Sequence, residues 1–315
     1  MAPHDFVDLK HEPRPKSPVG GDSPKVFPRI TAVVLNWCGE TVTKECLRSL
    51  QRSEYQDLTV LLVDNGSPDG SGDRLRATFP DVDFLQTGRN LGYAGGNNRG
   101  IEWALDRGAD YVLIANNDTV LEPRCVGALL RTAVGGDNVG GTAPKILRHD
   151  APDRIWYAGG DFSWLLGLGT HRREGEWDDP AKDDGAVEVS FMTGCCCLLS
   201  AEALRQIGGF DEAYFAYVED ADLSLRMKKG GFRMLYQPNA RVLHHCPSPG
   251  TSPTPFQIRH RDRNRRRVMR RHFGLTRRLP FRLRFVVTRM LLLAKYLSAR
   301  DQPRARAILD GMFGS

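Results

Sequence analysis

Short apolar runs alternate with amphipathic segments through the first third of this chain. The runs have the length and aliphatic content of buried strands and cover residues 30–35, 58–63, 82–86 and 111–115. Apolar residues at helical spacing predict helices over residues 41–52 and 96–107, and the turn formers of residues 64–70 predict a loop. Strands that alternate with helices imply an α/β fold, in which helices flank a twisted, mostly parallel central sheet. Ligands of such sheets bind at the carboxyl ends of the strands.

Polar side chains stand where three of these predicted strands end. Asn36 follows the first strand, Asp64 the second, and the triplet Asn116-Asn117-Asp118 the fourth. A carboxylate in this position can hold a divalent cation against a phosphate. Asp64 is compatible with a turn cap and with a contact to a nucleoside base or ribose, and we favour the nucleoside contact. The strand ends therefore predict a nucleotide site.

A second group of acids, Glu219, Asp220 and Asp222, opens a predicted helix over residues 221–229. The helix dipole stabilises acids at a helix start, which is one explanation for the group. A carboxylate across the crevice from the nucleotide can also take a proton from an attacking hydroxyl, and adjacent carboxylates raise one another's proton affinity. Both explanations can hold at once, with Asp222 contributing mostly to structure. Together with Asp118, these acids predict group transfer from a nucleotide-activated donor.

A glycine-rich segment, residues 90–96, precedes the predicted helix 96–107. Its glycines at positions 92, 95 and 96 permit either a turn with tight helix packing or a close approach of backbone amides to a diphosphate. Their spacing does not match the dinucleotide fingerprint GxGxxG, so no dinucleotide cofactor is indicated.

The composition describes a folded protein with a distinct N-terminus. The chain has 315 residues, of which 41% are hydrophobic, and this is enough for one large core or two modest ones. Residues 1–28 contain six prolines and no apolar core of signal-peptide type, so we expect a flexible tail. The run Cys195-Cys196-Cys197 lacks the spacing of a zinc or redox motif, which indicates small buried thiols in a reducing compartment.

Arginine dominates the C-terminal region, residues 256–315. Twelve arginines and one acid fall between Arg259 and Arg284, although the net charge of the whole chain is only +6. The apolar stretch 285–297 that follows is interrupted by two basic residues and is too short for a transmembrane helix. An interfacial helix on an anionic membrane surface explains both features, and a C-terminal helix packed on the body with a solvated basic face is the alternative. No nucleic-acid readout motif accompanies the arginines, so we expect no nucleic-acid partner.

These segments together resemble the family 2 glycosyltransferases, and in particular their bacterial rhamnosyltransferase branch. The motifs of the first half, in the family's order, are Val33-Val34-Leu35-Asn36-Trp37, Val63-Asp64-Asn65-Gly66-Ser67, Asn90-Leu91-Gly92-Tyr93-Ala94-Gly95-Gly96-Asn97-Asn98-Arg99-Gly100 and Asn116-Asn117-Asp118. Those of the second half are Thr193-Gly194, Gly208-Gly209-Phe210-Asp211-Glu212 and Tyr217-Val218-Glu219-Asp220-Ala221-Asp222-Leu223-Ser224-Leu225-Arg226. The resemblance runs from about residue 30 to the C-terminus, and the order of the motifs makes it specific.

The resemblance implies a GT-A fold over residues 29–255, with a nucleotide-sugar-binding half (29–145) and an acceptor-binding half (146–255). It implies a nucleoside-diphosphate sugar donor, here dTDP-rhamnose, a divalent metal, Mg²⁺ or Mn²⁺, and inversion at the anomeric carbon. The donor-binding positions that it assigns are Asn36, Asp64, Asn90, Asn97 and Asn117. The metal ligands that it assigns are Asp118, His244 and Asn116, the last of which replaces the first acid of the family's Asp-x-Asp motif.

The resemblance also assigns roles in the second half. Asp220 matches the catalytic base, with Glu219 as the next candidate, and the acceptor-side positions are Thr193, Gly194 and Asp222. Strand alternation points the adjacent His244 and His245 in opposite directions, and we place the ligand at His244. The polar stretch 171–184 is expected to be a mobile acceptor-side segment.

The acceptor implied is a cell-envelope glycan or a polyprenyl-linked sugar, and the enzyme would be cytoplasmic and peripheral on the inner face of the cell membrane. A catalytically silent module that binds sugar nucleotides or glycans on the same fold is the alternative.

Overall fold

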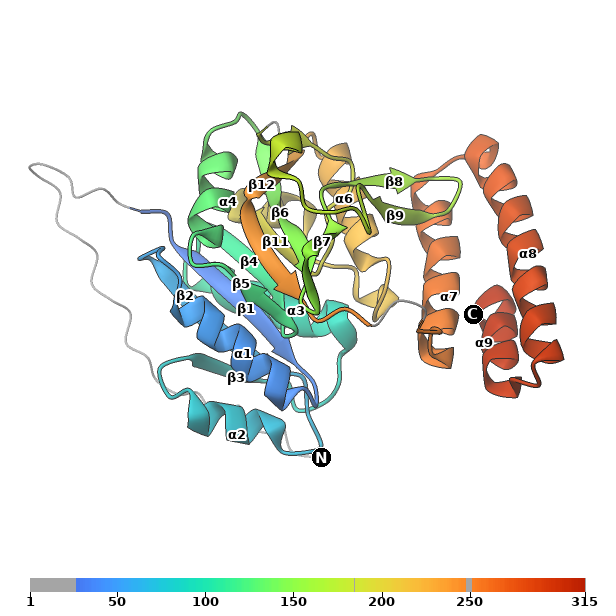
Figure 1. The fold of residues 1–315 in the computed structure, drawn as a ribbon, viewed down its shortest axis with the longest axis horizontal. Coiled ribbons are helices and arrows are strands. Elements are labelled where there is room, and N and C mark those ends of the chain that lie inside the picture. The colour runs from blue at the N-terminus through green and yellow to red at the C-terminus, as the bar shows by residue number, and fades with distance from the viewer. Residues whose placement is uncertain (1–26, 184, 248–250, 315) are drawn as a thin grey trace, which may run out of the picture.

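The structure is a computed structural model that describes residues 27–183, 185–247 and 251–314. The predicted flexible tail, residues 1–28, lies outside the described residues except for its last two positions. The described chain forms one large sheet covered by helices, with a separate layer of three C-terminal helices beside it (Figure 1).

Four parallel strands and three helices build the first half. The strand order is β4-β1-β2-β3, from β1 (Ile30–Asn36), β2 (Leu58–Asp64), β3 (Asp83–Gln86) and β4 (Tyr111–Asn116). The helices are α1 (Glu40–Gln51), α2 (Ser71–Thr78) and α3 (Gly92–Asp106). The four predicted strands and the two predicted helices are confirmed, although α3 begins at Gly92 instead of residue 96. The sequence did not predict α2, because this short polar helix buries only one large apolar side chain, Leu75.

The second half adds strands of both directions to the same sheet. Its elements are β5 (Thr119–Leu121), α4 (Cys125–Val134), β6 (Val139–Arg148), β7 (Ala151–Tyr157), β8 (Gly160–Ser163), β9 (Leu168–His171), the 3₁₀ turn Pro180–Lys182, β10 (Val187–Glu188), β11 (Cys196–Ser200), α5 (Ala201–Ile207), the 3₁₀ turn Glu212–Tyr214, α6 (Glu219–Lys229) and β12 (Arg233–His244). The predicted helix 221–229 is confirmed as α6. The full order is β10-β12-β6-β11-β4-β1-β2-β3, with β5 and β7 paired to β12 and β6, while β8 and β9 form a separate two-stranded sheet.

The reversed direction of β11 decides where the polar segments meet. β11 pairs antiparallel with β4 on one side and with β6 on the other, and β12 pairs parallel with β6. The carboxyl ends of β1, β2, β4, β6 and β12 therefore lie at the same edge of the sheet as the amino end of β11. That edge carries the motifs around Asn36, Asp64, Asp118, Gly194 and His244.

The middle of the sheet is the core of the protein. β1 is almost entirely buried between α1 and α3, and β4 is buried beside it against α3, as expected for parallel strands with near-continuous apolar sequence. The prediction of small buried thiols is confirmed for Cys195, Cys196 and Cys197, which are free and buried at β11.

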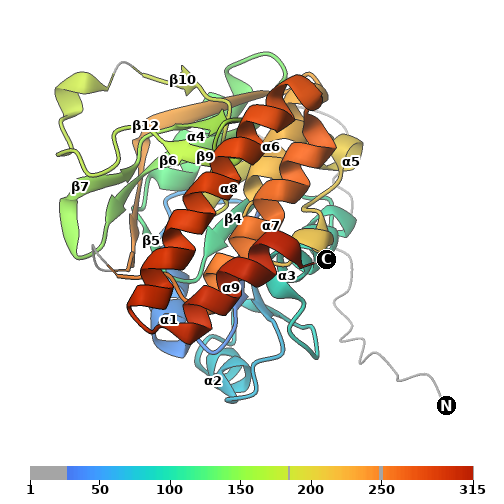
Figure 2. The ribbon, with the colours of Figure 1, turned by 90° about the vertical axis from the view of Figure 1, so that its right-hand side faces the viewer.

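Three helices follow the sheet domain: α7 (Pro255–His272), α8 (Leu275–Ser298) and α9 (Gln302–Phe313). Thr254 starts α7 with a capping box in which its hydroxyl accepts from the Gln257 amide while the Gln257 side chain accepts from the Thr254 N–H. α8 and α9 lie side by side with α7 and form one outer face of the molecule (Figure 2). Within the described ranges, no helix is long and apolar enough to cross a membrane.

Candidate active site

Asp64 ends β2 at the centre of a buried hydrogen-bond network. Its two oxygens accept from the Asn36 side chain (2.8 Å), the Ser67 hydroxyl (2.6 Å) and amide (3.1 Å), and the Gln86 side chain (2.8 Å). Gly72, at the start of α2, packs so closely that a Cβ there would lie 2.4 Å from the Asp64 carboxyl carbon. The network fixes the Asp64 carboxylate rigidly at the strand end, where a nucleoside contact was predicted.

The other predicted donor positions are joined to this strand edge by side-chain hydrogen bonds. The Asn117 amide donates to Thr43 Oγ1 (2.8 Å), and Thr43 donates in turn to Asn36 Oδ1 (3.0 Å). Asn90 Oδ1 accepts from Asn65 (3.2 Å) and caps the start of α3 at the Gly92 amide (2.8 Å). Sequence reasoning assigned no positioning role to Thr43, which lies inside α1, or to Asn65, which was quoted only as part of the motif around Asp64.

Asn97 lies one turn into α3, and its side chain is only partly satisfied. Its amide donates to the Tyr93 carbonyl (3.0 Å), whereas the buried Oδ1 has no hydrogen-bond partner. A buried acceptor without a partner lowers the stability of the folded protein, and a bound ligand or water would supply the missing hydrogen bond.

Asn116, Asp118 and His244 form the predicted metal position. Asp118 Oδ1 lies 3.4 Å from His244 Nε2, and both Asp118 Oδ1 and Asn116 Oδ1 are buried without a hydrogen-bond partner. The pairing of β12 with β5 brings the histidine here from the opposite half of the chain, at His244↔Thr119. Two orphaned oxygens and an imidazole nitrogen make a donor set that fits a divalent cation such as Mn²⁺ or Mg²⁺.

His244 is held on its other side by sulfur and by an aromatic ring. Its Nδ1 lies 3.1 Å from Cys246 Sγ, and the Trp156 ring packs edge-on with centroids 4.5 Å apart. Burial lowers the pKa of His244, but Cys195 and the Asp118 carboxylate raise it to about 10. Since imidazole binds metals only when neutral, binding of an ion here would displace that proton.

Asp220 and Glu219 open α6 in different environments. Asp220 Oδ2 accepts from the Gly194 amide (3.1 Å), and Asp220 Oδ1 accepts from the Ala221 amide (2.8 Å). Burial raises the pKa of Asp220, and these two backbone donors oppose the rise. Glu219 is 6% exposed and its Oε2 has no partner, so burial and the neighbouring Asp220 charge raise its pKa well above the usual range. Asp220 is thus the carboxyl group better able to hold a negative charge.

The chain just before these acids adopts a strained backbone. Phe215, Tyr217 and Val218 have φ values of 60°, 70° and 73°, in the region that side chains rarely adopt. Val218 is β-branched and is the residue that caps α6. Such strain persists only where the surroundings impose it, and it is concentrated at functional sites.

The Thr193-Gly194 motif connects the acids to the strand that carries the metal position. Gly194 donates to Asp220, its carbonyl accepts from the Tyr93 hydroxyl (2.6 Å), and the next residue, Cys195, accepts from the Asn116 amide (2.8 Å). Thr193 is buried and its hydroxyl accepts from the Cys195 amide (3.3 Å). One short segment thereby bridges the Asn116-Asn117-Asp118 triplet and the Glu219-Asp220 pair.

Two aromatic side chains that sequence reasoning did not assign lie between the two groups. Trp156, on β7, packs against both His171 (4.4 Å between centroids) and His244 (4.5 Å). Burial lowers the pKa of His171; the charge of Asp220 raises this pKa and the charge of His244 lowers it. Trp156 and His171 therefore link His244 to the surroundings of Asp220. The sequence predicted both residues only as members of an acceptor-side stretch and assigned no individual role to either of them.

Asp222 is fully buried and serves the packing of α6 against α7. Its oxygens accept from the Tyr214 hydroxyl (3.1 Å), His272 Nε2 (2.7 Å) and Arg226 Nε (2.7 Å). Burial raises the pKa of Asp222, but the hydrogen bonds from His272 and Arg226 lower it by more, so the pKa lies below its usual value and Asp222 remains ionised. With these partners, the acceptor-side role predicted for Asp222 becomes indirect: the residue positions the helix that carries Asp220.

A sequence model described as "Glycosyltransferase like family 2" matches residues 28–269, which include every motif named above. The chain belongs to glycosyltransferase family 2. A relative from Mycobacterium tuberculosis (strain ATCC 25618 / H37Rv), named N-acetylglucosaminyl-diphospho-decaprenol L-rhamnosyltransferase, is 33% identical over 277 residues, covering 82% of this chain and 89% of the relative. The protein is thus a family 2 glycosyltransferase with a rhamnosyltransferase homologue, as the resemblance predicted.

Solved structures of other transferases have the same fold. GalNAc-T7 with UDP, GalNAc and Mn²⁺ superposes with a TM-score of 0.60 at 14% identity, over 78% of this chain and 48% of that one. The mannosyltransferase PcManGT from Pyrobaculum calidifontis, with GDP-Man and Mn²⁺, gives a TM-score of 0.54 at 16% identity, over 92% and 76%. These similarities confirm the predicted GT-A fold with helices added at the C-terminus.

Proposed function

We propose that this glycosyltransferase moves rhamnose from dTDP-rhamnose to a hydroxyl of a polyprenyl-diphosphate-linked sugar, with inversion at the anomeric carbon. The observation that supports the mechanism is that the Thr193–Cys195 segment contacts both groups: the Gly194 amide donates to Asp220, and the Cys195 carbonyl accepts from Asn116, two residues before Asp118. The rhamnosyl donor and the lipid-linked acceptor are supported by the name of the mycobacterial relative.

Asp118, Asn116 and His244 would hold the divalent metal, which supplies positive charge against the diphosphate as it leaves. Asp64, Asn36 and Asn117 would orient the nucleoside and its ribose at the ends of β1, β2 and β4. Asn90 and Asn97 flank the start of α3, where backbone amides favour an anion. The hydrogen-bond network around Asp64 holds these groups in place before the donor binds, so little conformational entropy is lost on binding.

Asp220 would act as the general base. The Gly194 amide fixes its carboxylate and partly offsets the burial that raises its pKa, which leaves a group able to accept a proton near neutral pH. Glu219 is a poorer base, because its burial without a partner favours the neutral acid. Thr193 and Gly194 would line the acceptor side by holding Asp220 in place.

Replacing Asp220 with Asn tests this assignment. Because general base catalysis contributes about 10²–10⁴-fold, we expect kcat to fall by about that factor with the donor Kd unchanged. Asp153→Asn, at an exposed carboxylate of β7, is the matched control and should retain full activity. A wild-type protein that binds dTDP-rhamnose but transfers nothing across an acceptor panel would instead support a catalytically silent binding module.

The C-terminal helices suit a lipid-linked acceptor at an anionic membrane surface. Apolar side chains recur every three or four residues along one exposed face of α8: Leu275, Leu279, Leu283, Val286, Val287, Met290, Leu291 and Leu297. Between α7, α8 and α9 lies a cavity of about 400 Å³, in which an apolar floor around Phe281 and Phe285 is surrounded by Arg266, Arg270, Arg278 and Arg282. An apolar stripe flanked by arginines is the pattern of a helix that lies in the membrane interface.

Vesicle sedimentation tests the proposed binding to an anionic membrane surface. We expect the protein to bind anionic vesicles more tightly than neutral ones, and the double variant L283Q/L291Q to lose most of that binding. Val134→Gln, at an exposed apolar residue of α4, is the control. Equal binding by L283Q/L291Q and wild type would refute the membrane role without affecting the proposed chemistry.

A further inference from the structure

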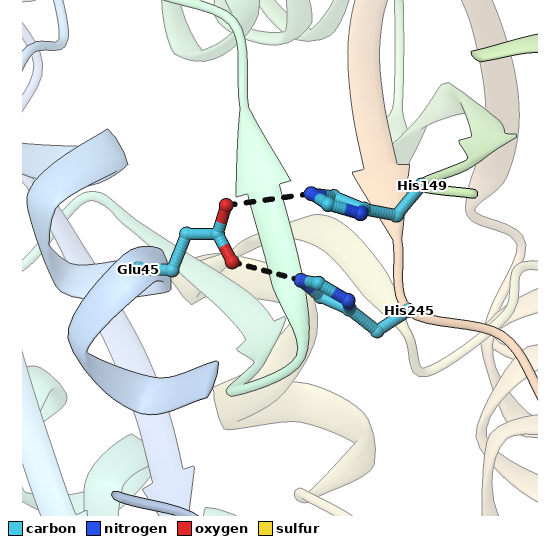
Figure 3. A group of neighbouring side chains, drawn as sticks. All are labelled: Glu45, His149 and His245. Atoms are coloured by element: carbon cyan, nitrogen blue, oxygen red, sulfur yellow. Dashed lines mark hydrogen bonds and ion pairs between the residues drawn. The ribbon is translucent and has the colours of Figure 1, made fainter. Parts of the chain in front are cut away.

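Glu45, His149 and His245 form a cluster outside the groups described so far (Figure 3). Glu45 Oε1 lies 3.3 Å from His149 Nε2, and Glu45 Oε2 lies 2.9 Å from His245 Nε2. The two imidazole rings are stacked with centroids 3.7 Å apart and an angle of 23° between their planes. Both rings thus direct the same nitrogen at one carboxylate.

Three separate elements supply these side chains. Glu45 lies in the middle of α1, His149 follows β6, and His245 follows β12. His244 and His245 point in opposite directions, as strand alternation predicts, so the cluster is distinct from the position at Asp118. All three side chains are partly exposed, at 44%, 33% and 29%, so an ion can reach them from solvent.

The donor atoms have the chemistry and spacing of a zinc site. The three ligand atoms lie within 4.8 Å of one another. A tetrahedral ion with bonds of about 2.0–2.2 Å separates its ligands by about 3.3–3.6 Å. The distance of 3.3 Å between His149 Nε2 and Glu45 Oε1 matches this separation, and the 2.9 Å between His245 Nε2 and Glu45 Oε2 would lengthen when an ion binds. Two imidazoles and one carboxylate favour Zn²⁺ over Mg²⁺, which prefers oxygen alone. Two histidines and a glutamate also leave the fourth position of the tetrahedron for water.

We propose that Glu45, His149 and His245 bind a Zn²⁺ ion, separate from the metal that assists transfer. The assignment stands on the geometry of the cluster and does not depend on the proposed donor or acceptor.

The ion would tie together three elements that carry the active site edge. α1 also bears Thr43, which bonds Asn36 and Asn117. The His245 amide donates to the Asp118 carbonyl (2.9 Å), and the His149 amide donates to the His244 carbonyl (2.8 Å). Bound Zn²⁺ would therefore cross-link α1 to the ends of β6 and β12 and should stabilise the folded protein increasingly as the free Zn²⁺ concentration exceeds its Kd.

Isothermal titration of the full chain with Zn²⁺, and absorption spectra with Co²⁺ as a zinc substitute, test the proposal. We expect H149N/H245N to bind one ion fewer per chain than wild type and to lose a tetrahedral Co²⁺ spectrum. Asp118→Asn should keep that spectrum, because it leaves the cluster intact. His260→Asn on α7 is the matched control for loss of an imidazole and should bind as wild type does.

Thermal denaturation provides the second measurement. Zn²⁺ should raise the Tm of wild type and of His260→Asn by more than that of H149N/H245N, which keeps only the position at Asp118. Equal stoichiometry in wild type and H149N/H245N, or a Co²⁺ spectrum lost in Asp118→Asn and kept in H149N/H245N, would overturn the proposal. If H149N/H245N does not fold, Glu45→Gln is measured in its place, since it removes one ligand and keeps the side chain volume.

Discussion

Lys145 is a fully buried cation on β6, and its removal should destabilise the protein strongly. Its Nζ donates to Asp178 Oδ1 (2.7 Å) and to Asp183, and its side chain is 0% exposed. Arg241 pairs with the other oxygen of Asp178 (2.7 Å), and Arg173 lies 3.4 Å from Asp183. The network anchors the described part of the polar segment, residues 171–183, on the sheet.

Lys145→Met keeps the approximate length of the side chain and removes its charge. The nearly buried carboxylates of Asp178 and Asp183 then each lose one cationic partner. Breaking a buried ion pair from one side costs about 3–5 kcal/mol. At about 2 °C per kcal/mol for a chain of this size, Tm should fall by about 6–10 °C. The triple variant K145M/D178N/D183N should lose less than the single variant, because no uncompensated carboxylate remains.

Thermal denaturation followed by circular dichroism measures both effects. Lys228→Met, at an exposed lysine of α6, is the control and should stay within about 0.5 kcal/mol of wild type. Limited proteolysis should also cut residues 171–183 of Lys145→Met faster than those of wild type. A Tm unchanged in Lys145→Met, or a triple variant less stable than the single one, would refute the reasoning.

Three further predictions follow from single positions. Asp220 must be ionised to act as a base, and burial raises its pKa above the usual value for aspartate of about 3.9. As the pH is lowered, log kcat/KM should therefore begin to fall at a pH above about 3.9. A profile that stays flat down to about pH 4 would contradict this. A Cβ on Gly100 would lie 2.3 Å from Val33, so Gly100→Ala should lose about 1–3 kcal/mol in urea denaturation, whereas Gly127→Ala, in α4, should gain up to about 1 kcal/mol. The pKa of Asp222 is lower in the folded than in the unfolded protein, so ionised Asp222 stabilises the fold above about pH 3.9, and this contribution is lost as the pH falls further. In urea denaturation at several pH values, the free energy of unfolding of Asp222→Asn should therefore fall less steeply below about pH 3.9 than that of wild type.

The strands and the edge at which the motifs meet could be predicted because they depend on local patterns. Apolar runs between turn formers identify β1, β2 and β4. Parallel pairing of these strands then brings Asn36, Asp64 and Asp118 to one edge of the sheet, and this does not depend on the contacts of their side chains. Strand alternation predicted that His244 and His245 point apart, and their imidazoles do contact different carboxylates, Asp118 and Glu45. The choice of His244 as the metal ligand came from the resemblance and stays a prediction.

Contacts between distant elements could not be predicted in this way. Glu45 and His245 are 200 positions apart in the chain, and their pairing needs the exact register of β12 beside β6. Trp156 and His171 meet because the chain turns back through β8 and β9. Neither arrangement produces a periodic signal, so a single sequence does not distinguish these residues from ordinary core or surface positions.

The reversal of β11 explains why the two halves of the site form one unit. If β11 ran parallel to β4, its amino end would lie at the opposite edge of the sheet, and Gly194 would be far from Asn116. Running antiparallel, the strand starts at the active edge, where the Cys195 carbonyl accepts from Asn116 and the Gly194 amide donates to Asp220. The position of the proposed base relative to the proposed metal is therefore set by the backbone bond from Asn116 to Cys195 and by the bond from the Gly194 amide to the Asp220 side chain. Asp220→Asn keeps an oxygen that can accept from Gly194, so this substitution should alter chemistry more than geometry.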